Sequence, residues 1–276
     1  MAKIITRLLP TPSQKIELRG LYLEHRLHEI GSPEKPFVYA NFLSSLDGRI
    51  ALENPDNGET YVPKCLTSKS DFRLFMELHA QADCLITHGG YLRSLAAKKL
   101  GNILQVGIRT EDQDLAQWRL DNGLPTQPTV VIASASLDFS IPDSLKEHQQ
   151  SIYIATGANA DPERIAYWQD QGYPVLITGS NKWVQGELLI KALTELGMQS
   201  LYLIAGPHML ETMIREQQLS RLYQTLTHQL IGGEKFRSLV PGPALGNRGN
   251  LKLASLYYDA DEPIGASQFY CQFAVN

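Results

Sequence analysis

The stretch Phe37–Ala51, FVYANFLSSLDGRIA, places an uncharged apolar segment directly before an acidic turn. Asp47 is the first acidic residue after the apolar run, and Asp-Gly between two apolar segments is a strong signal for a hairpin turn. Asp47 is therefore either a turn residue or a carboxylate held where a buried strand ends. In the second interpretation it could meet a small polar ligand at the edge of a sheet.

The composition is that of an ordinary soluble globular protein. The 276 residues are 43% hydrophobic and 20% charged, and the formal net charge of −4 argues against nucleic acid or an anionic membrane as the main partner. No apolar run reaches the length of a membrane span, and the segment MAKIITRLLP is too short for a signal peptide. The three cysteines fit neither a disulfide framework nor a metal motif. We therefore expect a cytoplasmic protein.

Apolar strands alternate with amphipathic helices from Pro36 onward. Before that point, residues 1–35 are predicted to form an N-terminal helical extension, in which Ser13 caps a helix that Gly31-Ser32-Pro33 ends. Residues 36–276 are predicted to form one domain with a mostly parallel central sheet covered on both faces and with antiparallel C-terminal strands. Beyond the opening strand, the expected strands are 83–88, 129–133, 151–156, 173–178, 200–204, 221–230, 251–259 and 267–275.

Several common motifs do not occur in the sequence. There is no GxGxxG after a strand, no GxxxxGK[ST], no HExxH and no GxSxG, and the signature of the zinc deaminases is also missing. The histidines do not have the spacing of metal ligands, so no metal site is expected.

Two strand-to-helix junctions carry small residues where a phosphate group could bind. They are Leu85–Arg93, LITHGGYLR, and Leu203–Met209, LIAGPHM. The N–H groups at a helix start are unpaired, and a glycine lets a phosphate oxygen approach them. Either junction alone could be an ordinary turn. In an open α/β sheet, however, both fall at the carboxyl ends of strands, where ligands bind, and Asp47 falls at a third strand end.

The order of these features resembles the reductase half of the riboflavin-pathway deaminase-reductases, a pyrimidine reductase family with a dihydrofolate reductase-like fold. The family string S-x-D-G-[RK]-I-A is matched by Ser45–Ala51. The pattern A-[DE]-A followed by L-[VI]-G-A-G-T-[VY]-R is matched loosely by 81–83 and 86–93. The junction E-G-G-P-x-L corresponds to 204–209, and L-L-G-G corresponds to 230–233. The resemblance extends from about Pro36 to the C-terminus.

The resemblance implies a three-layer α/β domain and an NADPH-dependent reductase of a pyrimidine- or pterin-like small molecule. The family member it points to is 5-amino-6-(5-phosphoribosylamino)uracil reductase of riboflavin biosynthesis. Asp47 would donate a proton or orient a water, provided that its surroundings raise its pKa. A homodimer is expected because the family commonly pairs subunits. Two sets of residues would hold the cofactor pyrophosphate: Thr87, Gly89, Gly90, Tyr91 and Arg93 on one side, and Ala205, Gly206, Pro207, His208 and Met209 on the other.

Three hydroxyl residues at later strand ends, Ser134, Thr156 and Thr178, have two interpretations. They would bind the adenosine ribose and its 2′-phosphate, or they are ordinary capping residues.

The sequence also departs from the family pattern at positions that would face the substrate. Asn41 stands where the family usually has Lys, and Ile204 stands where it has Glu, while Ser45 is retained. Two neutral side chains in place of a charge pair alter what the pocket can bind. The alternative function is therefore a catalytically degenerate nucleotide-binding protein of the same fold. A third possibility is a structural partner of another enzyme, with residues 1–35 as the contact.

Overall fold

The computed structural model of the chain describes residues 2–263 and 265–275 and contains a large and a small sheet. The strands of the large sheet are β1 (Ile4–Leu9), β2 (Gln14–Glu17), β3 (Phe37–Ser45), β6 (Cys84–His88), β7 (Thr129–Ala133), β8 (Ile152–Thr156), β9 (Val175–Ile177), β10 (Ser200–Leu203), β11 (Arg221–Thr227), β13 (Leu251–Asp259) and β14 (Gln268–Val275). The small sheet contains β4 (Arg49–Glu53), β5 (Thr60–Tyr61) and β12 (Phe236–Ser238). The helices are α1 (Lys69–Ala80), α2 (Gly89–Ala96), α3 (Gln113–Asp121), α4 (Asp143–Glu147), α5 (Pro162–Asp170), α6 (Gly186–Glu195) and α7 (Pro207–Arg215).

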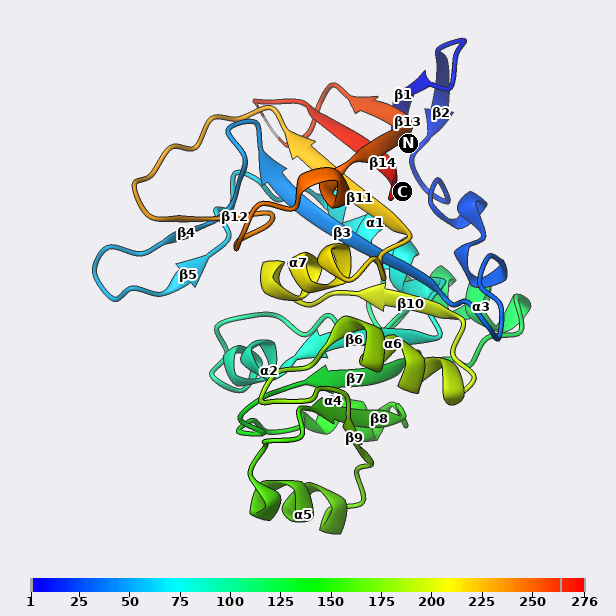
Figure 1. Cartoon of the computed structure of the whole chain (residues 1–276). Helices are drawn as coiled ribbons and strands as arrows, with labels where there is room; N and C mark the ends of the chain where they lie inside the picture. The colour runs from blue at the N-terminus through cyan, green and yellow to red at the C-terminus, as the bar shows by residue number, and fades with distance from the viewer. Residues whose placement is uncertain (1, 264, 276) are drawn as a thin grey trace.

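The large sheet runs through the whole molecule in the order β2-β1-β13-β14-β11-β3-β10-β6-β7-β8-β9 (Figure 1). From β11 to β9 every neighbouring pair is parallel. From β2 to β11 every pair is antiparallel. The predicted α/β class, with a mostly parallel central sheet and antiparallel C-terminal strands, is confirmed.

Helices cover both faces of the central strands. On one face α6 and α7 pack apolar side chains such as Leu189 and Leu210 against Val38 and Ala40 of β3. On the other face α1 packs against Tyr39, as Figure 1 shows by the position of α1 behind β3 and of α7 in front of it. No helix in the described part of the chain is long and apolar enough to cross a membrane.

Two helices begin at side-chain caps. The Ser68 hydroxyl accepts a hydrogen bond from the Asp71 N–H at 3.0 Å and starts α1. At the start of α5, the Asp161 carboxylate accepts from the Glu163 N–H at 2.9 Å, and Pro162 occupies the first turn. Both caps satisfy N–H groups that the helix itself leaves unpaired.

The predicted helix that begins at Ser13 is wrong. β1 and β2 pair as an antiparallel hairpin, and two short 3₁₀ turns, Leu23–His25 and Leu27–Glu29, follow. The backbone is left-handed at Gly20 (φ +87°) and at Arg26 (φ +46°), which a continuous α-helix does not allow. The apolar residues whose spacing suggested a helix are buried by this irregular segment instead. This holds for Leu18, Leu21, Tyr22 and Leu27, whereas Ile16 and Leu23 are half-buried and Ile30 is exposed.

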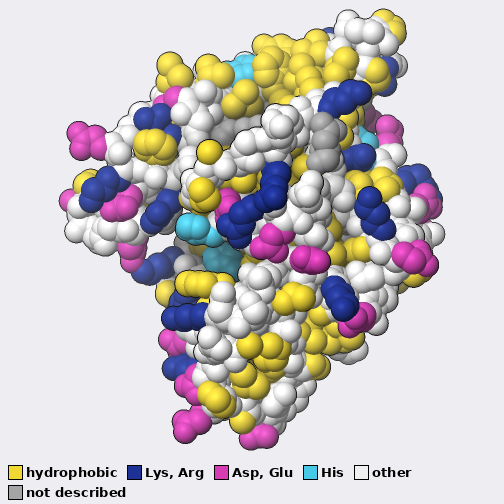
Figure 2. Space-filling view, viewed as in Figure 1, with side chains coloured by type: hydrophobic (Ala, Val, Ile, Leu, Met, Phe, Trp, Pro, Cys, Tyr) yellow, Lys and Arg dark blue, Asp and Glu magenta, His cyan; other side chains and the backbone are white. Residues whose placement is uncertain are grey.

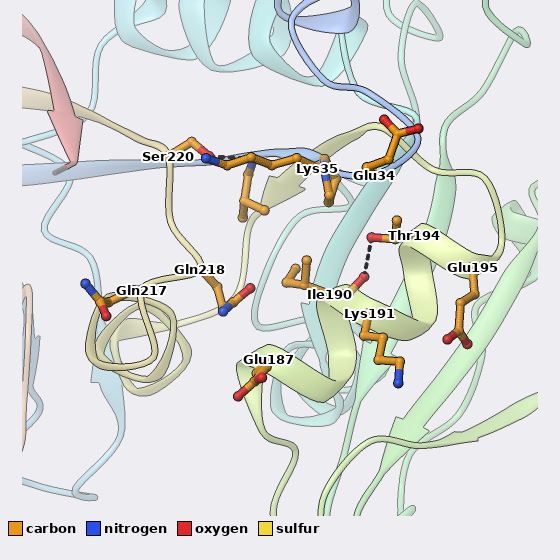
Figure 3. Close-up of a pocket in the computed structure, with 12 residues that line it drawn as sticks. Glu34, Lys35, Glu187, Ile190, Lys191, Thr194, Glu195, Gln217, Gln218 and Ser220 are labelled. Atoms are coloured by element: carbon orange, nitrogen blue, oxygen red, sulfur yellow. Dashed lines mark hydrogen bonds between the residues drawn. The ribbon is translucent and has the colours of Figure 1, made fainter.

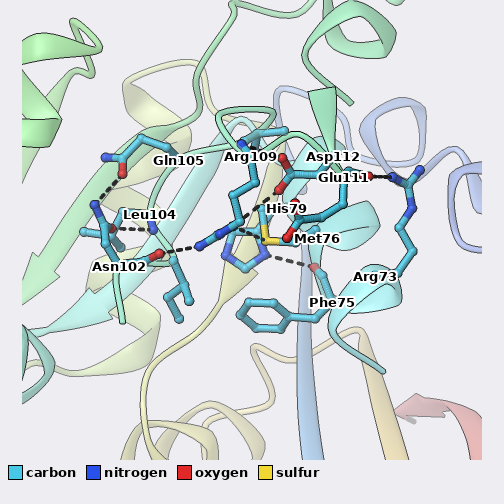
Figure 4. A network of polar contacts seen from close by, with 12 residues as sticks. Arg73, Phe75, Met76, His79, Asn102, Leu104, Gln105, Arg109, Glu111 and Asp112 are labelled. Carbon is cyan, nitrogen blue, oxygen red and sulfur yellow. Dashed lines mark hydrogen bonds and ion pairs between the residues drawn. The ribbon is translucent and has the colours of Figure 1, made fainter. Parts of the chain in front are cut away.

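The irregular segment between α2 and α3 is held by a polar network centred on Arg109 (Figure 4). The Arg109 guanidinium donates to the Asn102 carbonyl and forms an ion pair with Asp112 at 3.3 Å. It also lies 3.8 Å from the Met76 sulfur on α1. These contacts hold an irregular loop against α1. The hydrophobic periodicity of the sequence does not predict them, because they join polar groups of a segment without regular structure.

Candidate functional site

The site lies at the carboxyl ends of β3, β10 and β6, which are adjacent parallel strands. This arrangement brings together the turn at Asp47 and the two predicted junctions. A Cβ atom built on Gly206 would lie 3.8 Å from His88 Nε2, so the junctions after β10 and β6 are neighbours. Figure 2 shows a hollow at the left flank of the molecule, with histidine, lysine and arginine side chains around it.

The turn after β3 carries the chain from the large sheet to the small one. The Gly48 N–H donates to the Ser45 carbonyl at 3.0 Å, and Gly48 has a φ of +80°, which favours glycine. β3 and β4 do not pair across this turn, because β4 pairs with β12 and β5. Asp47-Gly48 is therefore a turn, but it does not close a two-stranded hairpin.

Asp47 is held as a carboxylate. It accepts hydrogen bonds from the Ser45 hydroxyl and from the Gly232 N–H at 2.9 Å, and it pairs with the Arg49 guanidinium at 2.7 Å. The Ser45 hydrogen bond is the main cause that lowers the pKa of Asp47 to about 2. The surroundings of Asp47 thus lower its pKa, whereas direct proton donation requires a raised one.

The three predicted substrate-facing residues differ in their roles here. Ser45 is fully buried and organises the turn, since its hydroxyl also accepts the Arg49 N–H at 3.0 Å. Asn41 is half-buried, and its Oδ1 is shielded from solvent without a hydrogen-bond partner. Ile204 is half-buried and packs against two of the apolar clusters.

The junction after β10 is open at its glycine. Gly206 is the N-cap of α7 without a side-chain cap, and Pro207 follows at the first helical position. Within residues 2–263 and 265–275, His88 is the only residue outside the chain neighbours with an atom within 4 Å of a Cβ built on Gly206. Ala205 is buried, Met209 is half-buried and His208 is exposed. The Met209 N–H already donates to the Gly206 carbonyl at 3.1 Å, so what the start of α7 offers an anion is the open space beside Gly206.

The junction after β6 is closed by packing. The His88 ring caps α2 by accepting the Tyr91 N–H at 3.3 Å, and burial lowers the pKa of this imidazole. A Cβ on Gly89 would lie 2.8 Å from Ser134 Oγ, and one on Gly90 would lie 2.9 Å from His88 Nδ1. A larger side chain at either position would clash with these protein atoms, so packing alone accounts for the two glycines without any bound ligand. His88 was not predicted as a site residue, although its place at a strand end before two glycines is a signal for an N-cap.

The remaining predicted cofactor residues are spread along the same edge of the sheet. Thr87 is buried, while Arg93 is exposed and donates to the Asp138 carbonyl at 2.8 Å. The Ser134 hydroxyl accepts the Leu137 N–H at 3.0 Å, which is a capping contact. The hydroxyls of Thr156 and Thr178 are buried without a hydrogen-bond partner.

A separate pocket of about 400 Å³ lies away from this edge (Figure 3). It is lined by Lys35, Pro36 and Val38 at the start of β3 and by Ile190 and Lys191 of α6. Because β3 begins here and ends at Ser45, this pocket is at the opposite end of the strand from Asp47. It shares no residue with the predicted site.

Comparison with known proteins gives one family and several similar folds. The family model of the RibD C-terminal domain matches residues 36–262. Nothing among the curated proteins matches the chain. A pyrimidine reductase-like protein from Corynebacterium diphtheriae has a TM-score of 0.63 at 17% identity, covering 87% of this chain and 92% of that one.

Two further solved structures are similar. RibD from Acinetobacter baumannii has a TM-score of 0.59 at 14% identity, covering 88% of this chain and 58% of that chain. The riboflavin biosynthesis reductase Rib7 from Saccharomyces cerevisiae has a TM-score of 0.58 at 14% identity, covering 93% of this chain and 99% of that one. The expected fold class is confirmed by this likeness.

Proposed function

This chain belongs to the RibD C-terminal domain family, and on that premise we propose that it is an NADPH-dependent reductase of a pyrimidine- or pterin-like small molecule. Family membership supports an oxidoreductase. The observation that carries the proposal is the meeting of two helix starts, at Gly206 and at His88, beyond the ends of neighbouring strands. Such a place suits a dinucleotide pyrophosphate.

The residues at this edge fit a bound dinucleotide. The open glycine at 206 and the start of α7 would hold the pyrophosphate from one side. The start of α2 after His88 would face it from the other side. Ser134, Thr156 and Thr178 remain candidates for the ribose and its phosphate. NADPH, when bound, supplies the hydride, and the protein positions the ring that accepts it.

Asp47 is proposed to act as an ionised residue. With its pKa lowered to about 2, it is a carboxylate at neutral pH and would orient a water molecule or a donor group of the substrate. Its partners Ser45, Arg49 and Gly232 hold it in one position. The proton that balances hydride transfer would then reach the substrate through that water.

The proposed substrate resembles that of 5-amino-6-(5-phosphoribosylamino)uracil reductase, but Asn41 and Ile204 alter the pocket. Neither side chain carries charge, and the side-chain oxygen Oδ1 of Asn41 is shielded from solvent with no hydrogen bond within standard geometry. These two residues also support the second candidate, a nucleotide-binding protein of this fold that has lost catalysis. In either case we propose a homodimer, because Leu251 and Leu253 of β13 are more than one-third exposed.

Two measurements separate these candidates. Titration with NADPH and NADH is followed by tryptophan fluorescence, for which the exposed Trp183 in the loop before α6 is well placed. Oxidation of NADPH is then followed with a panel of reducible pyrimidines and pterins. Binding with turnover supports the reductase, and tight binding without turnover supports the nucleotide-binding protein. Failure of both nucleotides to bind at millimolar concentration would contradict both.

A further inference from the structure

The small sheet is attached to the large one as a flap. We use the name flap for residues 49–61 and 234–238, which contain β4, β5 and β12. In Figure 1 the flap projects at the left of the molecule. Within residues 2–263 and 265–275, none of its side chains belongs to an apolar core cluster. Packing against the core therefore does not fix its position, and a segment of this kind opens at low cost.

The two chain segments that lead from the large sheet into the flap each contain glycine in the left-handed region. Gly48 (φ +80°) lies between β3 and β4, while Gly232 (φ +62°) and Gly233 (φ +94°) lie between β11 and β12. Asp47 ties these segments together, because its carboxylate accepts the Gly232 N–H at 2.9 Å. A movement of the flap about these glycines would therefore act on the residue that we propose to face the substrate.

One ion pair spans the gap between the flap and the segment after α2. The Lys99 ammonium pairs with the Glu59 carboxylate, and both side chains are exposed. Among the described residues, this is the one hydrogen bond or ion pair that joins residues 50–62 to a residue outside the flap. Lys99 itself is anchored, since its N–H donates to the Ser94 carbonyl on α2 at 2.9 Å. The pair thus connects a fixed helix end to a loosely held sheet.

The position of this ion pair relative to the candidate site follows from the strand order. In the large sheet β10 lies between β3 and β6. The flap follows β3 and α2 follows β6, so the contact of Glu59 with Lys99 bridges the carboxyl end of β10, where Gly206 begins α7. The hollow seen in Figure 2 lies on the flank from which the flap projects. A ligand beside Gly206 would thus be enclosed between this bridge and the sheet.

We propose that Glu59 and Lys99 form a latch that holds the flap closed over a ligand at the ends of β3, β10 and β6. They are positioning residues, because they act on the ligand through the flap and through Asp47. An exposed ion pair is weak, so the latch opens often enough for the ligand to leave. The inference rests on the proposed function for the identity of that ligand, NADPH, and adds a control of its release.

Charge reversal tests the latch. Dissociation of NADPH is followed by stopped-flow fluorescence, and we expect its rate constant to rise by about threefold or more in Lys99→Glu, because two carboxylates then repel each other across the gap. The same increase is expected in Glu59→Lys. The double variant restores the ion pair with its charges exchanged, and its rate constant should lie within about twofold of that of the wild type.

The ion pair of Glu53 with Lys235 provides the matched control, since it joins two segments within the flap at 3.4 Å. Lys235→Glu should leave the rate constant of NADPH dissociation unchanged. Equal rate constants for the wild type and Lys99→Glu overturn the proposal. An increase in Lys99→Glu that the added Glu59→Lys does not reverse also overturns it.

A measurement without cofactor separates the latch from the proposed function. Amide hydrogen exchange of the unliganded protein, measured by NMR, should be about threefold faster or more in Lys99→Glu at Gly232 and at residues 54–61, and unchanged in β10. Gly232 lies at the hinge rather than at the latch, so its exchange reports movement of the whole flap. Faster exchange there, with no NADPH binding to the wild type, supports the latch and contradicts the proposed cofactor. Unchanged exchange at Gly232 contradicts the latch, whatever the wild type binds.

Discussion

Asp47 and Asp71 are held in opposite electrostatic environments. Hydrogen bonds from Ser45 and Gly232, together with Arg49, lower the pKa of Asp47 to about 2. Burial raises the pKa of Asp71 to about 6. The sequence singled out only Asp47, because the burial of Asp71 depends on contacts with residues distant in the chain.

Replacement of Asp47 tests its proposed role. Asp47→Asn removes the charge but keeps an acceptor for the Gly232 N–H, so we expect NADPH binding to be unchanged and turnover to fall by at least about tenfold. The measurement is steady-state NADPH oxidation beside a nucleotide titration, with the exposed Asp56→Asn as control. Full turnover in Asp47→Asn would show that Asp47 serves only to form the turn after β3.

Replacement of Gly206 tests the phosphate site. Its φ is negative and the space above it is open, so Gly206→Val should fold normally while the side chain occupies the place of the phosphate. We expect the NADPH dissociation constant to rise by at least about tenfold, which corresponds to about 1.4 kcal/mol. Gly101→Val is the matched control, since a Cβ at Gly101 also meets open space. An unchanged dissociation constant would remove this junction from the site.

The regular elements were predicted where hydrophobic pattern and capping agree. β3, β6, β7, β8 and β10 are short apolar runs, and α1 and α5 begin at recognisable caps. The small sheet was not predicted, because β5 and β12 are very short and largely exposed and leave no periodic pattern. The N-terminal strands were mistaken for a helix because turns at Gly20 and Arg26 place apolar residues at a helix-like spacing.

The end of α1 is held by a buried arginine from α3. Arg119 has no exposed surface, and its guanidinium donates to the carbonyls of Ala80 at 2.9 Å and Ala82 at 2.8 Å. Arg119→Met would leave these carbonyls unpaired, and we expect a loss of about 3 kcal/mol in the free energy of unfolding. Urea denaturation measures this change. Arg164, which forms an exposed ion pair with Asp138, provides the control. Arg164→Met should change the free energy of unfolding by no more than about 0.5 kcal/mol.

His79 should make α1 sensitive to acid. Burial is the main cause that lowers the pKa of this imidazole from 6.5 to about 3, and its ring lies within the network of Figure 4. Below pH 6.5 the His79 imidazole of the unfolded chain binds a proton, whereas in the folded chain it does so only below about pH 3. Stability is therefore complete above pH 6.5 and falls toward pH 3, by about 1.4 kcal/mol per pH unit. Denaturation at several pH values should show a shallower fall in His79→Gln, and identical slopes would contradict this account.

The N-terminal segment is part of the same packed structure as the family domain. The Gly20 and Tyr22 N–H groups donate to Glu77 on α1, at 2.6 and 3.0 Å, and Leu27 is fully buried. β1 also extends the large sheet by pairing with β13. The boundary near residue 35 remains a prediction from sequence, and the family match begins at residue 36.

Deletion of residues 1–35 tests that boundary. Because the segment buries apolar surface against α1 and satisfies Glu77 and Gln81, the shortened chain should aggregate or melt at least about 10 °C lower. Differential scanning calorimetry of the full and shortened chains measures the effect. A shortened chain with the melting temperature of the full one would identify residues 1–35 as a separate appendage.

The gathering of the site at one edge of the molecule was predictable, since parallel strands bring their carboxyl ends together. Asp47, Gly206 and Gly89 were predicted to lie at this edge in this way, and their positions after β3, β10 and β6 agree with that. The role of each residue was less predictable. Gly89 is a glycine because a larger side chain would clash with Ser134, and Thr156 and Thr178 are buried. Packing between layers decides such roles, and a single sequence does not record it.

The geometry of β3 also constrains how this site can change in evolution. Tyr39, Asn41, Leu43 and Ser45 share one face because they are two residues apart. A one-residue insertion or deletion between Tyr39 and Ser45 would exchange the faces of the strand side chains beyond it, moving Asn41 or Ser45 to the opposite face of the sheet. New specificities can therefore arise here by substitution at fixed positions, but length variation within this strand should be absent among functional descendants of the chain.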